Sequence, residues 1–170
     1  MTELDEPIHL CTYDQRWPTL FASEARRIAA GLPVDVAIEH IGSTSDPGLL
    51  AKPIIDVMLG GEPHHSLAGM RSALVALGYE DLGEAGVPGR IYFRRRAKTA
   101  FNIALVVRGG SIWTANLALR DYLRANSDAA REYAETKRSA FETGIRSLLA
   151  YSDYKSAVLA RLMSRALDSH

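Results

Sequence analysis

Two neighbouring segments decide the fold: Glu39-His40-Ile41-Gly42-Ser43-Thr44 and, a few residues later, Lys52-Pro53-Ile54-Ile55-Asp56-Val57-Met58. The first segment closes the stretch Val34–Ile41, in which apolar and polar side chains alternate as they do in a half-buried strand. The second lies within Pro53–Gly60, whose apolar residues on both faces predict a buried strand. A Gly-Ser pair separates the two predicted strands and marks a turn.

Similar patterns continue on both sides of these strands. Apolar side chains at helical spacing predict a first helix capped by Asp14 and a second helix over Ser66–Leu77. Two more strands are predicted over Arg90–Arg96 and Thr99–Arg108, after a loop over Gly78–Gly89. The order of these elements predicts a small mixed sheet.

The chain after Ser111 is predicted to be helical throughout. Its apolar stripes mark three helices, the last of them capped by Ser152. Lys137 falls within the middle stripe, where we expect its methylene stem to lie along the apolar seam. The predicted fold class is therefore α/β (α+β), in one domain over 1–170. The sheet core would occupy about residues 12–110 and a C-terminal helical bundle 111–170.

Composition narrows the class of protein. The 170 residues fit one domain, and 20 basic against 20 acidic side chains leave no net charge to attract nucleic acid or an anionic membrane. Cys11 is the single cysteine, so an internal disulfide and a cysteine zinc site are excluded. The acidic N-terminus has no signal-peptide pattern, and no apolar run is long enough to span a bilayer. We expect a cytoplasmic protein without a nucleic-acid or membrane partner.

The turn after the first predicted strand has the chemistry of a phosphate site. Gly42 has no side chain, so an anion can approach the backbone closely. Ser43 and Thr44 add hydroxyl donors at the point where a short helix would begin. The plain alternative is that these three residues only cap a turn.

Asp56 interrupts an apolar strand. A buried carboxylate is costly unless a metal ion, a cation or several hydrogen bonds compensate its charge. The structural alternative to a functional role is a carboxylate neutralised by Lys52 or by an arginine from the helices. The spacing of the Gly-Ser turn and Asp56 therefore predicts an anion site beside a lone acid.

At these residues the sequence resembles the GrpB-like family, also called UPF0157, which is grouped with the nucleotidyltransferase superfamily. The resemblance extends over nearly the whole chain and also includes Tyr13–Pro18, Leu77–Tyr79, Arg120–Arg124, Tyr133-Ala134 with Lys137, and Tyr154-Lys155. It implies a polymerase-β-like nucleotidyltransferase fold. It also implies that the chain binds a nucleotide or a phosphorylated small molecule.

The resemblance assigns roles residue by residue. Gly42 and Ser43 would hold the phosphates, and Asp56 would bind Mg²⁺ or Mn²⁺ and align an oxygen nucleophile for transfer of a nucleoside monophosphate. Asp56 and Ser43 would then be the catalytic pair. The residues themselves, apart from the resemblance, add Thr44, Lys52, Arg90 and Lys155 to Gly42 and Ser43 as expected phosphate ligands, and His40 and Asn102 as residues expected elsewhere in the pocket.

The carboxylate set that such a transferase uses is incomplete. The position that shares a strand face with Asp56 is Met58, which is no ligand for a hard cation. The later strand that should carry a third acid has Asn102 and Ala104 instead. The alternative function is a catalytically impaired binding module, or a scaffolding or folding helper with a protein partner. The fusion of GrpB-like domains to dephospho-CoA kinase in some bacteria fits that alternative.

The basic side chains have alternatives of their own. The cluster around Arg90 would either receive phosphates or guard an edge strand against pairing with another sheet. Lys155 would either reach a phosphate across a cleft or remain solvated. Arg120 and Asp121 are expected to anchor the helices to the sheet.

Overall fold

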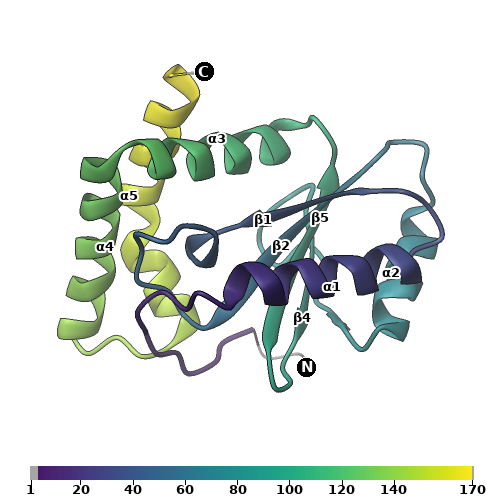
Figure 1. The fold of residues 1–170 in the computed structure, drawn as a ribbon, viewed down its shortest axis with the longest axis horizontal. Helices are drawn as coiled ribbons and strands as arrows, with labels where there is room; N and C mark the ends of the chain where they lie inside the picture. The colour runs from purple at the N-terminus through teal and green to yellow at the C-terminus, as the bar shows by residue number, and fades with distance from the viewer. Residues whose placement is uncertain (1–3, 170) are drawn as a thin grey trace.

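A sheet of five strands forms the centre of residues 4–169, which are the residues that the computed structural model describes (Figure 1). The strand order is β1-β2-β5-β4-β3. β2 and β5 are parallel, and the other neighbouring pairs are antiparallel. The bounds are β1 Ala37–Ile41, β2 Ile54–Gly61, β3 Glu80–Asp81, β4 Ile91–Arg95 and β5 Ala100–Val107. The predicted mixed sheet is confirmed.

Helices flank the sheet, and three of them form a bundle at one end of it (Figure 1). The two N-terminal helices are α1 Trp17–Gly31 and α2 Leu67–Ala76. The bundle consists of α3 Ser111–Ala125, α4 Ser127–Glu142 and α5 Leu148–Asp168. A single 3₁₀ turn, η1 Ser43–Ser45, follows β1. The helical C-terminal part agrees with the prediction.

The predicted caps of two helices are wrong. α1 begins at Trp17, and Asp14 accepts a hydrogen bond from the Arg16 amide at 2.9 Å without capping the helix. α5 begins a full turn before the expected cap, because the Ser147 side chain accepts from the Ala150 amide. Ser152 therefore lies inside α5.

The strand bounds also differ in two places from those predicted. β1 begins at Ala37, later than the alternation from Val34 indicated. Glu80 and Asp81, in the predicted loop, form the short edge strand β3 against β4. Local sequence did not show this strand, since its hydrogen bonds come from a distant partner.

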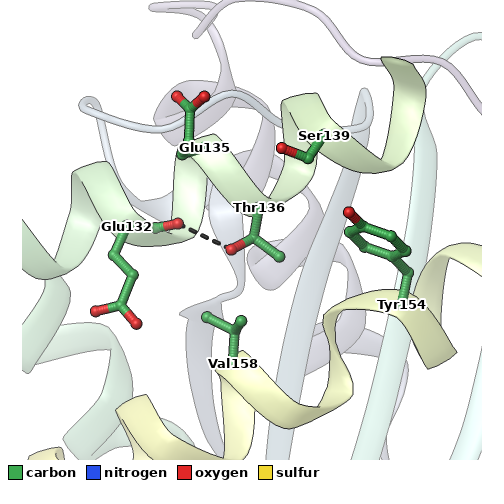
Figure 2. A pocket seen from close by; sticks show the side chains of 6 residues that line it. All are labelled: Glu132, Glu135, Thr136, Ser139, Tyr154 and Val158. Atoms are coloured by element: carbon green, nitrogen blue, oxygen red, sulfur yellow. Dashed lines mark hydrogen bonds between the residues drawn. The ribbon is translucent and has the colours of Figure 1, made fainter. Parts of the chain in front are cut away.

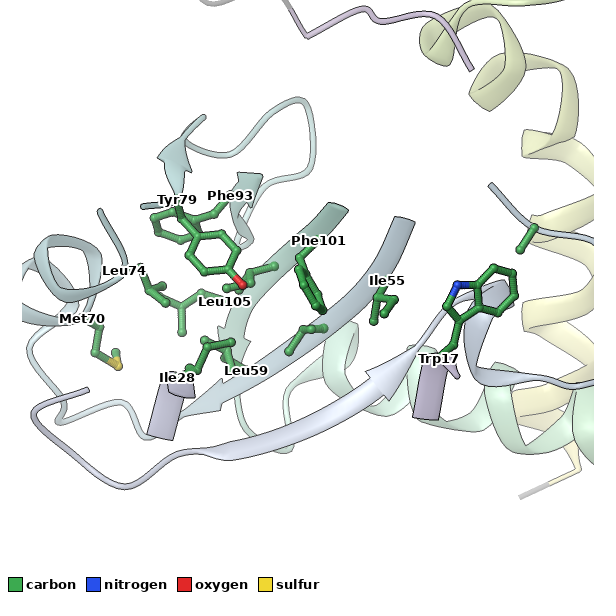
Figure 3. Close-up of a cluster of buried hydrophobic side chains, with 13 residues drawn as sticks. Trp17, Ile28, Ile55, Leu59, Met70, Leu74, Tyr79, Phe93, Phe101 and Leu105 are labelled. Carbon is green, nitrogen blue, oxygen red and sulfur yellow. The ribbon is translucent and has the colours of Figure 1, made fainter. Parts of the chain in front are cut away.

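One face of the sheet packs against α1 and α2. Buried side chains of β2 and β5 that point to this face meet apolar residues of both helices (Figure 3). Burying such side chains contributes about 1.5–3 kcal/mol each, so this layer dominates the stability of the sheet. The cluster includes Ile28 of α1, Leu74 of α2, Ile55 and Leu59 of β2, and Ile103 of β5.

The opposite face of the sheet points toward the bundle. Met58 is fully buried there against Ile41, Val106 and Trp113. Asp56, two residues before Met58, has the same orientation on β2 because side chains alternate along a strand. The acid therefore lies on the face that the bundle covers. Within residues 4–169 no helix is long and apolar enough to cross a membrane.

Candidate functional site

A cavity of about 800 Å³ opens between the bundle-facing side of the sheet and helices α3 and α5. It brings together residues that are far apart in the sequence. Of the residues predicted to form the site, those that line it are Gly42, Ser43, Thr44, Lys52, Asp56, Arg90, Asn102 and Lys155. His40 is not among the lining residues.

The Gly42 turn lies directly against Asp56. Gly42 has φ 71° and ψ −174°, a backbone conformation essentially reserved for glycine. A Cβ at this position would come within 2.5 Å of Asp56 Oδ2. The turn is fixed by Ser45, whose amide and hydroxyl donate to the Gly42 carbonyl at 3.1 and 2.6 Å. The lack of a side chain at position 42 thus allows the turn and the acid to meet.

Asp56 is paired with Asn102, its register partner on β5. The Asn102 side-chain amide donates to Asp56 Oδ1 at 2.8 Å, and its oxygen accepts from Arg96 at 3.0 Å. Arg96 in turn forms an ion pair with Glu6 at 2.6 Å. Among the described residues Asp56 forms no ion pair. The alternative that Lys52 or an arginine neutralises it is therefore not what the structure shows, and its side-chain partner is the Asn102 amide.

The residues around Asp56 do not fit a two-metal centre. Within residues 4–169 no three histidine, cysteine or acidic side chains gather closely enough to hold a metal ion. The Asn102 oxygen is already engaged by Arg96, and Met58 is buried in an apolar cluster. Asp56 is then a single oxygen donor for a hard cation that prefers several. These residues therefore do not support a chemical step through a metal ion.

Two lysines bring positive charge to the cavity. Burial lowers the pKa of Lys52 to about 8, although the Asp56 carboxylate acts in the opposite direction. Burial also lowers the pKa of Lys155, and Asp56 again opposes the shift. Lys155 Nζ lies 4.5 Å from the ring centroid of Tyr151, a buried residue of α5. Both lysines therefore lie in the site and are not simply solvated.

Arg90 lines the cavity from the start of β4. Its guanidinium stacks over Tyr92, with 4.9 Å between the guanidinium carbon and the ring centroid. It donates to the Ala85 carbonyl at 3.1 Å, and its buried Nε has no hydrogen-bond partner within the described part of the chain. A cation with a free donor remains available to an anionic ligand.

Lys137 is the functional candidate that the sequence analysis missed. Its side chain is 1% exposed, so the ammonium end is buried together with the stem. Nζ forms a hydrogen bond with Ser43 Oγ and donates to the Leu50 carbonyl at 2.8 Å. The sequence showed a lysine inside an apolar stripe. A lysine whose stem lies along the seam while its ammonium reaches solvent gives the same pattern, so the pattern did not distinguish the two arrangements.

His40 supports the turn from behind. Its Nε2 is 2.9 Å from Thr44 Oγ1, and its ring stacks on Phe21 with centroids 4.6 Å apart. Burial, together with nearby arginines of α3, lowers the pKa of His40 to about 4. A neutral imidazole held in this way fixes Thr44, so the predicted pocket role of His40 is replaced by a supporting one.

Arg120 connects the bundle to the first strand. It pairs with Glu39 at 2.7 Å and with Asp121 at 2.8 Å, and it donates to the His40 carbonyl at 3.2 Å. The predicted anchoring role is confirmed. These bonds hold α3 against β1 and so help to fix one wall of the cavity.

A second pocket, of about 450 Å³, lies between α4 and α5 (Figure 2). Its polar lining consists of Glu132, Glu135, Thr136 and Ser139, with Tyr154 and Val158 on α5. Thr136 donates to the Glu132 carbonyl within α4 at 2.9 Å. Among residues 4–169, no basic residue is in the lining of this pocket, and the arginines beside its glutamates are engaged in ion pairs: Arg161 and Arg165 with Glu132, and Arg138 with Glu135. The pocket therefore offers no free cation to an anion.

Known proteins resemble this chain over most of its length. A UPF0157 protein of Streptomyces coelicolor is 38% identical over 159 residues, which cover 94% of this chain and 84% of the relative. A UPF0157 protein of Halalkalibacterium halodurans is 37% identical over 168 residues, covering 94% and 82%.

Two solved structures also match this chain, one of them over nearly its whole length. The crystal structure of the conserved protein GrpB from Enterococcus faecalis matches with a TM-score of 0.84 and 29% identity, covering 95% of this chain and 98% of that one. The Cid1 poly(U) polymerase structure with Mg and 3'-dATP matches 77% of this chain and 45% of its own, with a TM-score of 0.43 and 13% identity. The model of the family described as GrpB protein matches residues 7–165. The chain belongs to the GrpB family.

Proposed function

We propose that this protein binds a phosphorylated small molecule, such as a nucleotide, in the cavity between the sheet and the bundle. The observation that carries the proposal is the convergence of Lys52, Arg90 and Lys155 on one cavity whose floor is the Gly42-Ser43 turn. These side chains come from three separate parts of the fold. Cationic side chains and a hydroxyl around a glycine turn are the groups that hold phosphate oxygens.

The ligand would be held by protein cations, without a divalent metal. Lys52, Arg90 and Lys155 supply positive charge, whereas Asp56 and Asn102 supply too few free oxygen donors for Mg²⁺. Asp56 would then balance the charge of the empty cavity. Transfer of a nucleoside monophosphate by metal-assisted chemistry is not part of this proposal.

The cavity is large enough for a nucleotide-sized ligand. Ligand pockets commonly have volumes of about 300–1,000 Å³, and the volume here is about 800 Å³. Apolar side chains of α3 and α5, among them Ile112, Leu119 and Leu159, line the part away from the cations. This division suits a molecule with an anionic end and a less polar end.

Thermal denaturation and calorimetric titration with ATP and with inorganic tripolyphosphate, both in EDTA, test the proposal. We expect both compounds to raise the melting temperature, since a ligand at a hundred times its Kd stabilises the native state by about 2.7 kcal/mol. Lys155→Met should weaken binding by about tenfold or more. Lys98→Met, which removes an exposed lysine outside the cavity, is the matched control and should change nothing.

Two results would overturn the proposal. One is the absence of any stabilisation by millimolar phosphate compounds. The other is equal weakening by Lys155→Met and Lys98→Met, which would mean that the anions bind to general surface charge. Comparison of ATP with tripolyphosphate also shows whether the apolar part of the cavity contributes to affinity.

A further inference from the structure

Lys137 contacts Ser43 from outside the cavity lining. Lys137 reaches from α4 to the turn that follows β1, and its Nζ has two oxygen neighbours, Ser43 Oγ and the Leu50 carbonyl. A carbonyl can only accept, so it holds Nζ in place through one N–H. The hydroxyl can donate as well as accept, so its proton can point at the nitrogen if that nitrogen is uncharged.

The surroundings of Lys137 favour the uncharged amine. Its side chain is 1% exposed, and it forms no ion pair with any described carboxylate. The ring of Tyr133 lies 4.1 Å from Nζ and favours the ammonium, so it opposes the effect of burial. The charged groups that face it are Lys155 from α5, Lys52 and Asp56 on or beside β2, and Asp46 after η1. Burial is the largest cause that lowers the pKa of Lys137 well below its usual range. The two lysines add to this shift, and Asp46 and Asp56 act in the opposite direction.

Ser43 connects this amine to the cavity. Its side chain belongs to the cavity lining, whereas Lys137 lies behind it and does not. Gly42 beside it leaves the approach open, since that residue has no side chain. A ligand in the cavity can therefore contact Ser43, whereas Lys137 lies outside the lining.

We propose that Ser43 is a nucleophile and Lys137 its general base, acting on an ester or thioester group of the bound ligand. Serine–lysine pairs can activate a hydroxyl in this way, because an amine in hydrogen-bond contact can take its proton. This inference rests on the proposed phosphate binding in one respect: the anionic end of the substrate lies in the phosphate site. Acyl chemistry fits better than phosphoryl transfer, since an acyl carbon carries no negative charge and needs no metal to neutralise it.

Each step balances. The Ser43 oxygen forms a bond to the acyl carbon as its proton passes to Lys137 Nζ, and the bond from that carbon to the leaving oxygen or sulfur breaks. The leaving group takes the proton from Nζ and departs as an alcohol or thiol. Water then attacks the acyl-serine and gives a proton to Nζ, which returns it to the Ser43 oxygen. The products are a carboxylic acid and the alcohol or thiol.

A neutral fluorophosphonate and p-nitrophenyl acetate test the pair. The first forms a stable bond to an activated serine with loss of fluoride, and the second reports turnover by release of p-nitrophenol. We expect peptide mass spectrometry to find one label, on Ser43. The labelling rate of the unmodified protein should rise with pH as Lys137 loses its proton and then level off. Neither reagent carries an anionic phosphate, so these results are independent of tripolyphosphate binding.

Three variants give matched comparisons. Ser43→Ala should abolish labelling, and Lys137→Met should slow it by about a hundredfold or more. Ser156→Ala removes an exposed serine hydroxyl of α5 that lies outside the cavity lining and should leave the rate unchanged. Circular dichroism shows whether Lys137→Met is folded, and the site of labelling and the pH profile need no variant. Labelling at any other residue, no labelling at all, or an unchanged rate in folded Lys137→Met would overturn the proposal. Tripolyphosphate binding without labelling would refute the pair and leave the proposed binding function intact.

Discussion

Asn102 faces Asp56 across the β2–β5 register and donates its side-chain amide to the carboxylate at 2.8 Å. The amide stands where a second acid would be needed to hold a divalent cation beside Asp56. Its own oxygen is turned toward Arg96. This pair therefore places one hydrogen-bonded carboxylate in the cavity lining, with the Asn102 amide rather than a second acid beside it.

Asn102→Asp should convert this pair into a metal site. Two carboxylates in contact repel, so without metal we expect the variant to lose about 1–3 kcal/mol of unfolding free energy at neutral pH. Mn²⁺ should restore stability in the variant, because two oxygen ligands then face the ion. Thermal denaturation with and without Mn²⁺ measures both effects.

Asn102→Ala and the unmodified protein are the controls for that experiment. Neither should gain stability from Mn²⁺, since each has Asp56 as the one carboxylate at this place. A Mn²⁺-dependent rise in the unmodified protein as large as that in Asn102→Asp would contradict our description of the site.

The architecture was largely predictable from the sequence because local patterns determine it. Alternation over the first strand, apolar residues on both faces of the second, and apolar stripes after Ser111 identified the main elements, which the structure confirms. The edge strand at Glu80 and Asp81 was not predictable, because its hydrogen bonds depend on β4. The start of α5 at Leu148 was missed since Ser147 and Ser152 are equally good caps in the sequence.

Only the part of the site that comes from one short stretch of the sequence was predictable. The Gly-Ser turn and Asp56 lie close together in the chain, and their residue types indicated an anion site. Lys137 could not be placed, because helical spacing gives the face on which a residue lies but not whether its charged end reaches solvent. Its contact with Ser43 joins α4 to the first turn of the fold, and only the packed structure shows it.

Gly42→Ala should disturb both the fold and the cavity. The backbone conformation at residue 42 costs about 1–3 kcal/mol for any residue other than glycine, and the added methyl group would overlap Asp56. We expect the unfolding free energy to fall by about 3 kcal/mol. Tripolyphosphate affinity of the folded variant should also fall, because the turn must move away from the acid. Urea denaturation and calorimetric titration measure the two quantities.

Gly144→Ala is the matched control for that substitution. Gly144 also has a positive φ, 89°, but no heavy atom lies within 4 Å of the position its Cβ would take. The Gly144→Ala variant should lose about 1 kcal/mol of unfolding free energy, because of its backbone conformation alone, and keep its affinity for tripolyphosphate. Equal losses of stability and affinity in the two variants would show that the contact between residue 42 and Asp56 has no special effect.

The pH dependence of anion binding should follow the charge of Lys52. Burial holds the pKa of Lys52 at about 8 in the protein without ligand, so its ammonium is present below that pH and is lost as the pH rises through it. The terminal phosphate of ATP titrates near pH 6, as a phosphate ester does, and keeps its full charge above pH 8. We therefore expect ATP affinity to fall by about tenfold between pH 7 and pH 10. Lys52→Arg keeps its charge throughout this range, and calorimetric titration should show a flatter profile for it. If both proteins lose affinity in parallel, the pH dependence arises from another group, and Lys52 does not bind the anion.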